Sequence, residues 1–143
     1  MLIGSSDSDA SDRHLTVHHN YLKNLSSRLP SYRGGTGHVY NNLYENIETS
    51  GVNTRVNACV RIEKNHFISA TKPICTLDSD VVGKAEVLDN LFESSTQATG
   101  SEYPPACTWS AAYTYTADPV SCVKAMVQAN AGVGKIDPLV GLP

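Results

Sequence analysis

One stretch decides the fold of this chain: Val17-His18-His19-Asn20-Tyr21-Leu22. The same pattern returns over residues 39–44, 62–67 and 87–92. Its central asparagines are 22, 23 and 25 residues apart, and they are Asn20, Asn42, Asn65 and Asn90. Self-similarity at a period in this range is the sequence signature of a repeat architecture.

Each copy has a β-branched residue three positions before the asparagine and a Leu, Tyr or Phe two positions after it. These two positions cannot face the same side of one straight strand, because side chains alternate with a period of two. A bend at the asparagine, which tolerates the left-handed backbone conformation, resolves the conflict. Two short strands that meet at such a bend in every repeat predict one corner of a parallel β-helix.

Stacked coils would place equivalent residues above one another at a spacing of about 4.8 Å. The asparagines would then form a ladder in which each amide donates to the next and accepts from the one before. The apolar flanks would form two interior columns, namely Val17, Val39, Ile62 and Val87, and beside them Leu22, Tyr44, Phe67 and Phe92. Amphipathic helices fit less well, since Asn and β-branched residues are poor helix formers. A leucine-rich or other mixed solenoid would need a helical half-repeat, and the sequence between the copies offers none.

The amino-acid composition limits the classes of function that we expect. The 143 residues suffice for one domain, and 17% of them are charged, with a net charge of −3. This balance gives no reason to expect a nucleic acid or a membrane surface as partner. We also find no run approaching the roughly 20 apolar residues of a membrane span, and no leader of the signal-peptide type.

The two ends of the sequence differ. Met1–Gly4 resembles the inside of a strand already under way, so we expect the first coils of the solenoid to be missing. The coils are predicted to span about 10–96 and an irregular tail about 97–143. Within the tail, Val123–Gly134 is predicted to form a short amphipathic helix with a glycine stop.

Four cysteines occur without the C-x-x-C spacing of a metal site, and they allow three pairings: Cys59, Cys75, Cys107 and Cys122. Cys107 and Cys122 bracket a tail segment that lacks the repeat. A disulfide between these two would hold the tail against the coils and would indicate an oxidising compartment. Free buried thiols are the alternative.

Residues 17–33 and 37–42 strongly resemble polysaccharide lyase family 1, the pectate lyases and pectin lyases. The Arg-x-Pro-x-x-Arg motif of this family is matched by Arg28, Pro30 and Arg33. Asn53–Arg55 and Ala131–Gly134 are similar to the fungal type of pectate lyase. The resemblance covers essentially all of residues 1–143, but it covers only the C-terminal part of the one family domain.

The resemblance implies an all-β, right-handed single-stranded parallel β-helix, partial here, with an irregular tail. It further implies a secreted monomer that cleaves (1→4)-α-D-galacturonan, the backbone of pectate, by β-elimination. Arg28 would be the base that removes the C5 proton in the +1 subsite, and Arg33 would contact the substrate carboxylate. The family's Ca²⁺ ligands and its catalytic lysine lie N-terminal to the arginine motif. Only 27 residues precede Arg28, so we expect these groups to be absent and this chain alone to be inactive.

The chemistry explains why arginines suit this task. A proton next to a charged carboxylate is weakly acidic, so the site must neutralise that carboxylate with cations such as guanidinium groups or calcium. An arginine base needs a strongly lowered pKa, because arginine is otherwise permanently protonated. Three alternatives stay open: a pectin lyase, a non-catalytic β-helix that binds polyuronides, and a structural solenoid without a ligand.

Other charged residues have plainer interpretations. The cluster of Asp7, Asp9 and Asp12 lacks the glycine and glutamate of a calcium loop, so we expect a solvated loop. Lys23, the lysine nearest to the motif, falls on a structural position. Arg55 could extend the substrate groove.

Several residues outside the motif are expected to serve the solenoid. One of His18 and His19 should face the interior and the other solvent, without binding a metal. We expect Arg61 to be an outward strand residue paired with Glu48 or Glu63. Tyr113 and Tyr115 should cover the coils rather than stack on sugars.

Overall fold

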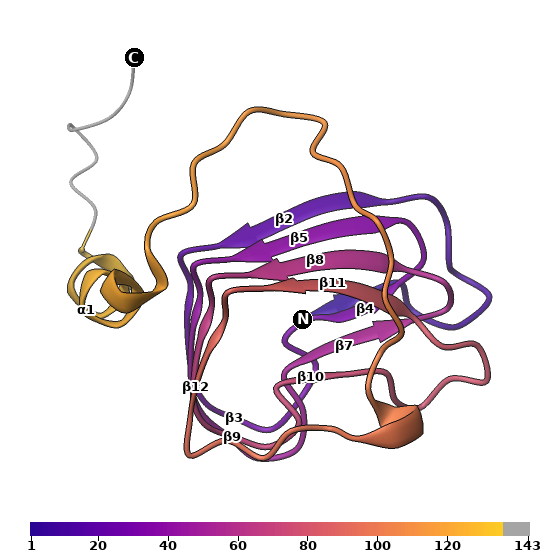
Figure 1. Ribbon diagram of the computed structural model, residues 1–143, viewed down its shortest axis with the longest axis horizontal. Coiled ribbons are helices and arrows are strands. Elements are labelled where there is room, and N and C mark those ends of the chain that lie inside the picture. Colours follow the sequence, from indigo (N-terminus) through magenta and orange to yellow (C-terminus); the bar gives the residue numbers. More distant parts are fainter. Residues whose placement is uncertain (136–143) are drawn as a thin grey trace.

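The computed structural model describes residues 1–135, and in this range the chain winds into a right-handed parallel β-helix (Figure 1). Its three parallel sheets have four strands each. Sheet A contains β1 (Leu2–Ile3), β4 (Ser31–Arg33), β7 (Val52–Arg55) and β10 (Ile74–Cys75). Sheet B contains β2 (His14–His18), β5 (Thr36–Tyr40), β8 (Cys59–Glu63) and β11 (Lys84–Leu88). Sheet C contains β3 (Tyr21–Leu25), β6 (Leu43–Ile47), β9 (His66–Ala70) and β12 (Leu91–Glu93).

The strand register confirms both predicted interior columns. Val17 pairs with Val39, Val39 with Ile62, and Ile62 with Val87. The second column follows the same order on sheet C and consists of Leu22, Tyr44, Phe67 and Phe92. Its aromatic rings stack, with centroids 4.5 Å apart for Tyr44 and Phe67 and 5.3 Å apart for Phe67 and Phe92. Equivalent positions of successive repeats are therefore paired on both sheet B and sheet C, so each coil lies directly above the one before it.

The asparagine ladder is confirmed as well. The Nδ2 group of Asn20 donates to Asn42 Oδ1 at 2.9 Å, and Asn42 and Asn65 donate onward to Asn65 and Asn90 at 3.0 Å. The predicted place of the bend is wrong by one residue, because positive φ angles occur just before each ladder asparagine, at His19, Asn41, Lys64 and Asp89. The ladder asparagine itself must turn inward, where Nδ2 of Asn42 also bonds the carbonyl of Tyr40 at 3.0 Å.

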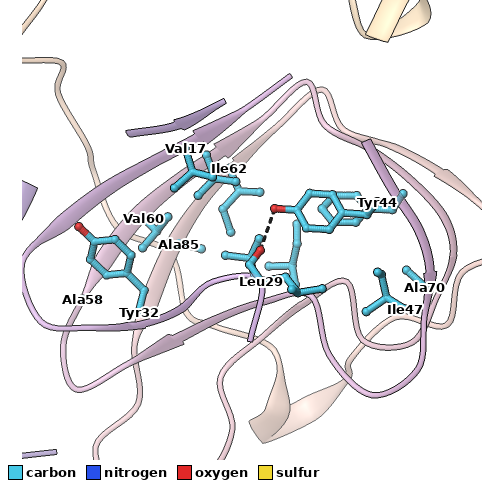
Figure 2. Packing of buried hydrophobic residues seen from close by; sticks show 14 residues of the cluster. Val17, Leu29, Tyr32, Tyr44, Ile47, Ala58, Val60, Ile62, Ala70 and Ala85 are labelled. Atoms are coloured by element: carbon cyan, nitrogen blue, oxygen red, sulfur yellow. Dashed lines mark hydrogen bonds between the residues drawn. The ribbon is translucent and has the colours of Figure 1, made fainter. Parts of the chain in front are cut away.

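Two tyrosines anchor the interior close to the arginine motif (Figure 2). Tyr44 is fully buried and donates its hydroxyl proton to the carbonyl oxygen of Leu29 at 2.8 Å. Tyr32 is equally buried and donates to the carbonyl of Thr36 at 2.6 Å. Burial raises the pKa of Tyr32 to about 12 and also raises the pKa of Tyr44. Both hydroxyls therefore remain neutral donors that fix the backbone on either side of β4.

The tail leaves the coils after β12, forms the short helix η1 (Gly100–Glu102) and crosses the outer face of sheet B (Figure 1). It ends in α1 (Val120–Asn130), which begins three residues earlier and ends four residues earlier than the predicted helix 123–134. Val123 and Val127 pack α1 against Leu43 of β6. Among the described residues, no helix has the length and apolar character needed to cross a membrane. Residues 136–143 of the predicted tail lie outside the described range.

The disulfide considered between Cys107 and Cys122 does not form. Cys107 is bonded to Cys59 of β8, whereas Cys122 is an exposed free thiol on α1 and Cys75 is a buried free thiol. The tail explains this outcome, since it passes Cys59 on sheet B and then carries Cys122 around the corner to sheet C. The bond ties the tail to the third coil, as the prediction required, although through a different partner.

Candidate functional site

Arg28 lies on the loop that leads from sheet C into β4. Its backbone is left-handed, with a φ of 63°, and its side chain is exposed. A non-glycine residue persists in this conformation only where its surroundings fix it. The next residue provides that support, because the Leu29 amide donates to Gly51 of the following coil at 2.9 Å and its carbonyl accepts the Tyr44 hydroxyl. The fold thus presents Arg28 on a firmly held backbone.

Arg33 ends β4 and pairs in register with Arg55 on β7, so two guanidinium groups sit side by side on the outer face of sheet A. Only 7% of Arg33 and 6% of Arg55 is exposed. Their shared partner is Asp7, whose Oδ1 accepts from Arg33 Nε at 2.8 Å and from Arg55 at 3.4 Å. Ser79 completes the group, since it accepts from Arg55 Nε at 2.6 Å and donates to Asp7 at 3.0 Å.

The charged side chains in this group shift one another's pKa values. The hydrogen bond from Arg33, followed by that from Ser79, holds the pKa of Asp7 below its ordinary value. Burial lowers the pKa of Arg55, and the adjacent positive charge of Arg33 lowers it further. Two closely spaced cations opposite one carboxylate leave an excess of positive charge. Both guanidinium groups are already hydrogen-bonded here, to Asp7, to Ser79 and, from Arg33, to the carbonyl of Gly4 at 3.0 Å.

The acidic loop is exposed to solvent, as expected, and two of its carboxylates also form ion pairs. Asp7 belongs to the arginine group, and Asp9 forms an ion pair with Arg13. These ion pairs were not predicted from the sequence: Arg13 lies four residues after Asp9, and the coil brings Arg33 and Arg55 to Asp7. The signal was present in the sequence, since Asp7 and Arg33 are 26 residues apart, close to one coil. Sequence reasoning also missed Ser79.

The paired histidines both lie outside the solenoid, so the prediction that one faces the interior is wrong. Val17 points inward, which turns its neighbour His18 outward, and the bend at His19 keeps that ring outside too. The two Nδ1 atoms are 2.7 Å apart, and His19 Nε2 lies 2.9 Å from Asp118 of the tail. His18 stacks on Tyr40 with ring centroids 4.9 Å apart.

Arg61 is an outward strand residue as expected, but its ionic partner is Glu86 at 2.6 Å rather than Glu48 or Glu63. Tyr115 bridges Arg61 and Glu63, with its hydroxyl 2.9 and 2.6 Å from them.

The second tail tyrosine, Tyr113, contacts Thr16 and His38 through its hydroxyl, both at 2.7 Å. Both tail tyrosines therefore cover sheet B, as predicted. Lys23 pairs with Glu45 at 2.8 Å on sheet C, which agrees with a structural role.

The described residues do not fit a calcium site. Residues 1–135 contain no group of three His, Cys, Asp or Glu side chains that could hold a metal ion. The one carboxylate in the arginine group, Asp7, has its Oδ1 turned to Arg33, Arg55 and Ser79. Calcium needs six to eight oxygen ligands, so it finds no cage on this face.

The described residues form a parallel β-helix that carries a buried arginine pair on sheet A and the exposed Arg28 on the loop before β4. Residues 1–136 match the family model described as pectate lyase. The chain belongs to the pectate lyase family.

Relatives agree with this assignment. The pectate trisaccharide-lyase of Bacillus licheniformis is 46% identical over 96% of this chain and 40% of its own length. Pectate lyase B of Dickeya chrysanthemi is 37% identical over 94% of this chain and 40% of its own. A probable pectate lyase A of Aspergillus flavus is 38% identical over 92% of this chain, so a specifically fungal type stays a prediction.

Solved structures share the fold. A pectate lyase variant from Xanthomonas campestris superimposes with a TM-score of 0.85 at 36% identity, covering 94% of this chain and 45% of that one. Pectate lyase C from Erwinia chrysanthemi, solved with Ca²⁺, gives 0.85 at 35% identity over 99% of this chain and 44% of its own. This chain therefore spans less than half the length of the relatives that it matches.

Proposed function

We propose that this chain carries the arginine side of a lyase site that cleaves polygalacturonate by β-elimination. One observation carries the proposal: Arg28 is exposed, and among residues 1–135 its side chain has neither a hydrogen-bond nor an ionic partner, while it lies on the loop just before β4, the strand that ends at Arg33. A solenoid that used this arginine only for stability would engage it.

Arg28 acts as the base that takes the C5 proton of a galacturonate unit. The electron pair of the broken C5–H bond forms a double bond between C4 and C5, and the C4–O bond breaks. The glycosidic oxygen leaves with that bond's electrons and is protonated by solvent. Arg33 binds the substrate carboxylate, and the cation reduces the charge that develops beside C5 in the transition state. Arg55 extends the groove by one coil.

The substrate class follows from the same contacts. Two guanidinium groups on adjacent strands suit a polymer with a carboxylate on every sugar, and a charge-assisted contact is roughly twice as strong as a neutral one. A structure of a pectate lyase C variant contains pentagalacturonic acid. We therefore favour pectate over methyl-esterified pectin, whose neutral esters leave the arginines unpaired. A second candidate function is the binding of polyuronides by the same arginines without catalysis, and product formation separates the two.

Calcium, which the resemblance implies, would be held by residues other than 1–135, because these form no cage for it. We propose a secreted monomer, and the bond between Cys59 and Cys107 supports an oxidising compartment.

Calorimetric titration with trigalacturonate tests the binding half of the proposal. Arg33→Gln should weaken binding about 10- to 100-fold, because a hydrogen bond to a charged group contributes about 1.5–3 kcal/mol. Arg61→Gln is the matched control on sheet B and should bind as the wild type does. Equal affinity for trigalacturonate and its methyl ester would contradict the proposed carboxylate site.

The catalytic half is tested by the ultraviolet absorbance of the unsaturated uronide product. With polygalacturonate as substrate, any unsaturated product that the wild type forms should be lost when Arg28 is replaced by alanine. Absence of both trigalacturonate binding and product would leave the structural solenoid without a ligand as the better account.

A further inference from the structure

Arg33 and Arg55 need a third group to hold them side by side. Their strands β4 and β7 are neighbours in sheet A, and the two residues pair in register, so both side chains leave the same outer face. Neighbouring strands are about 4.8 Å apart, and two positive charges at that spacing repel each other. Without a partner between them, the two flexible side chains would turn away from each other.

The carboxylate of Asp7 lies between the two guanidinium groups. Its Oδ1 accepts from Arg33 Nε at 2.8 Å and from Arg55 Nη2 at 3.4 Å. Ser79, on the loop between β10 and β11, donates to the same oxygen at 3.0 Å and accepts from Arg55 Nε at 2.6 Å. One carboxylate oxygen therefore joins both arginines and the serine.

These bonds use only part of each guanidinium group. Arg33 donates from Nε to Asp7 and from Nη1 to the carbonyl of Gly4, whereas Arg55 donates from Nε and Nη2. Within residues 1–135, Nη2 of Arg33 and Nη1 of Arg55 have no acceptor. A guanidinium group is a rigid planar fork with five N–H donors, so fixing some of its nitrogens fixes the direction of the others. The remaining donors are those that a carboxylate ligand can bind.

The loop between β1 and β2 is shaped to bring Asp7 to this place. Gly4 has a φ of 86°, and a Cβ atom on it would lie 2.9 Å from Cβ of Arg33, so a side chain there would keep the loop away from β4. Asp9 pairs with Arg13 and closes the loop on itself. The side chain of Asp7 remains 44% exposed, so its bonds to the arginines form where a ligand can approach from solvent.

We propose that Asp7 and Ser79 are positioning residues, which hold Arg33 and Arg55 side by side and direct their unengaged nitrogens at the carboxylates of a polyuronide. This role rests on the proposed function, since it takes the polyuronide as the ligand of Arg33. Two guanidinium groups held one strand spacing apart bind two carboxylates of one polymer. Selectivity for the unesterified polymer therefore depends on a negatively charged residue of the protein.

Two other roles of Asp7 predict different results. A carboxylate that competed with the ligand for the arginines would weaken binding, so its removal would strengthen binding. A carboxylate that served only the loop would leave the affinity of the folded protein unchanged. Removing a negative charge from a cationic site by itself favours an anionic ligand, so a loss of affinity on removal of Asp7 is specific to positioning.

Calorimetric titration of this chain with trigalacturonate and with its methyl ester distinguishes these roles. Asp7→Ala should weaken trigalacturonate binding about 10-fold, the lower end of the loss expected when an arginine contact is removed outright. Binding of the methyl ester should change less than about two-fold, so the preference for free carboxylates falls. Asp12→Ala is the matched control, because it removes the same charge from the same loop at a residue that lies 3.4 Å from His14; it should bind within about two-fold of the wild type.

Ser79→Ala is a second variant that leaves the charge of the site unchanged. It removes the acceptor of Arg55 Nε and should weaken trigalacturonate binding about three-fold, as expected for one hydrogen bond. Circular dichroism should match the wild type for all three variants, and Ser79→Ala alone decides the matter if Asp7→Ala does not fold.

The failure of this role is distinguishable from the failure of the proposed function. If the wild type binds trigalacturonate, tighter binding by Asp7→Ala, or unchanged affinity in both Asp7→Ala and Ser79→Ala, would overturn the positioning role and leave the proposed function standing. A wild type that does not bind trigalacturonate would refute the proposed function and the positioning role together.

Discussion

The buried asparagine ladder should be a main source of stability, and Asn65→Asp tests this. The Nδ2 group of Asn65 donates to Val39 at 2.9 Å, to Glu63 at 3.1 Å and to Asn90 Oδ1 at 3.0 Å. Its Oδ1 accepts twice from Asn42, at 3.0 Å. An aspartate keeps the acceptor but turns a second oxygen towards three oxygens, in a position that is completely buried.

The magnitude follows from the contacts. A buried polar group that loses its partner costs about 1–3 kcal/mol, and burying an unpaired charge adds to this cost. Three acceptors lose their donor, so we expect the free energy of unfolding to fall by about 3–6 kcal/mol. A domain of ordinary size has only about 5–15 kcal/mol in total, so the change should be unmistakable.

Urea unfolding followed by circular dichroism measures the effect, and Asn46→Asp is the matched control. Asn46 makes one exposed side-chain bond, to Asn24 at 3.0 Å, and aspartate tolerates its left-handed backbone. The control should change stability by less than about 0.5 kcal/mol. Acid should partly restore Asn65→Asp, because a protonated carboxyl can donate again. A loss below about 1 kcal/mol at neutral pH would refute the view that the ladder stabilises the coils.

Three further predictions concern the tail and the arginine group. Cys107→Ser opens the 48-residue loop to Cys59 and should lower the unfolding free energy by about 4 kcal/mol on the loop-entropy model, measured by urea unfolding; an unchanged midpoint would contradict it. Asp7→Asn should destabilise the chain at neutral pH. The difference in unfolding free energy between the wild type and Asp7→Asn should be full above pH 3.8 and should disappear as the pH falls below that value. The reason is that the pKa of Asp7 is lower in the folded chain than its ordinary value of 3.8, so acid removes the stabilising charge. A pH-independent difference would exclude the ion pair. Burial lowers the pKa of His38, so the free energy of unfolding should fall as the pH drops below 6.5. Trp109, which packs against His38, reports this unfolding by its fluorescence, and His38→Gln should flatten the pH dependence.

The acid response of His38 depends on all the groups around its ring. Glu63 accepts from Nε2 at 2.7 Å and raises the pKa, which opposes burial, while Arg61 and His18 lower it. The Tyr113 hydroxyl lies 2.7 Å from Nδ1, and Tyr115 packs against the ring. Burial acts most strongly, so the neutral ring is favoured in the folded state.

The regular part of the fold could be predicted from the sequence because the coil imposes one register on every repeat. Once Asn20 and Asn42 occupy equivalent positions, the columns that contain Val17 and Leu22 follow from alternation alone. The exact bend could not be predicted in this way. It depends on which residue takes the left-handed conformation, and His19 takes it because Asn20 is committed to the ladder.

The irregular parts could not be predicted from periodicity. The pairing of Cys107 depends on the path of the tail over sheet B, and no repeat encodes that path. The same holds for the approach of Asp7 to Arg33 and Arg55, which is set by the loop between β1 and β2. For the site, the sequence indicated the motif arginines Arg28 and Arg33, whereas the structure adds Asp7, the carboxylate that Arg33 and Arg55 share. The roles of Arg28 and Arg33 in catalysis stay predictions.

The central claim is that Arg28 removes a proton from a polyuronide. The most direct measurement is the initial rate of unsaturated product from polygalacturonate in the presence of calcium, for the wild-type sequence and Arg28→Ala, each replacing the matched part of the Bacillus licheniformis pectate trisaccharide-lyase. The account predicts product with the wild type and a loss of at least about 100-fold with Arg28→Ala, while trigalacturonate binding is retained. Equal rates for the two proteins would contradict the account, as would a wild-type protein that binds trigalacturonate and forms no product.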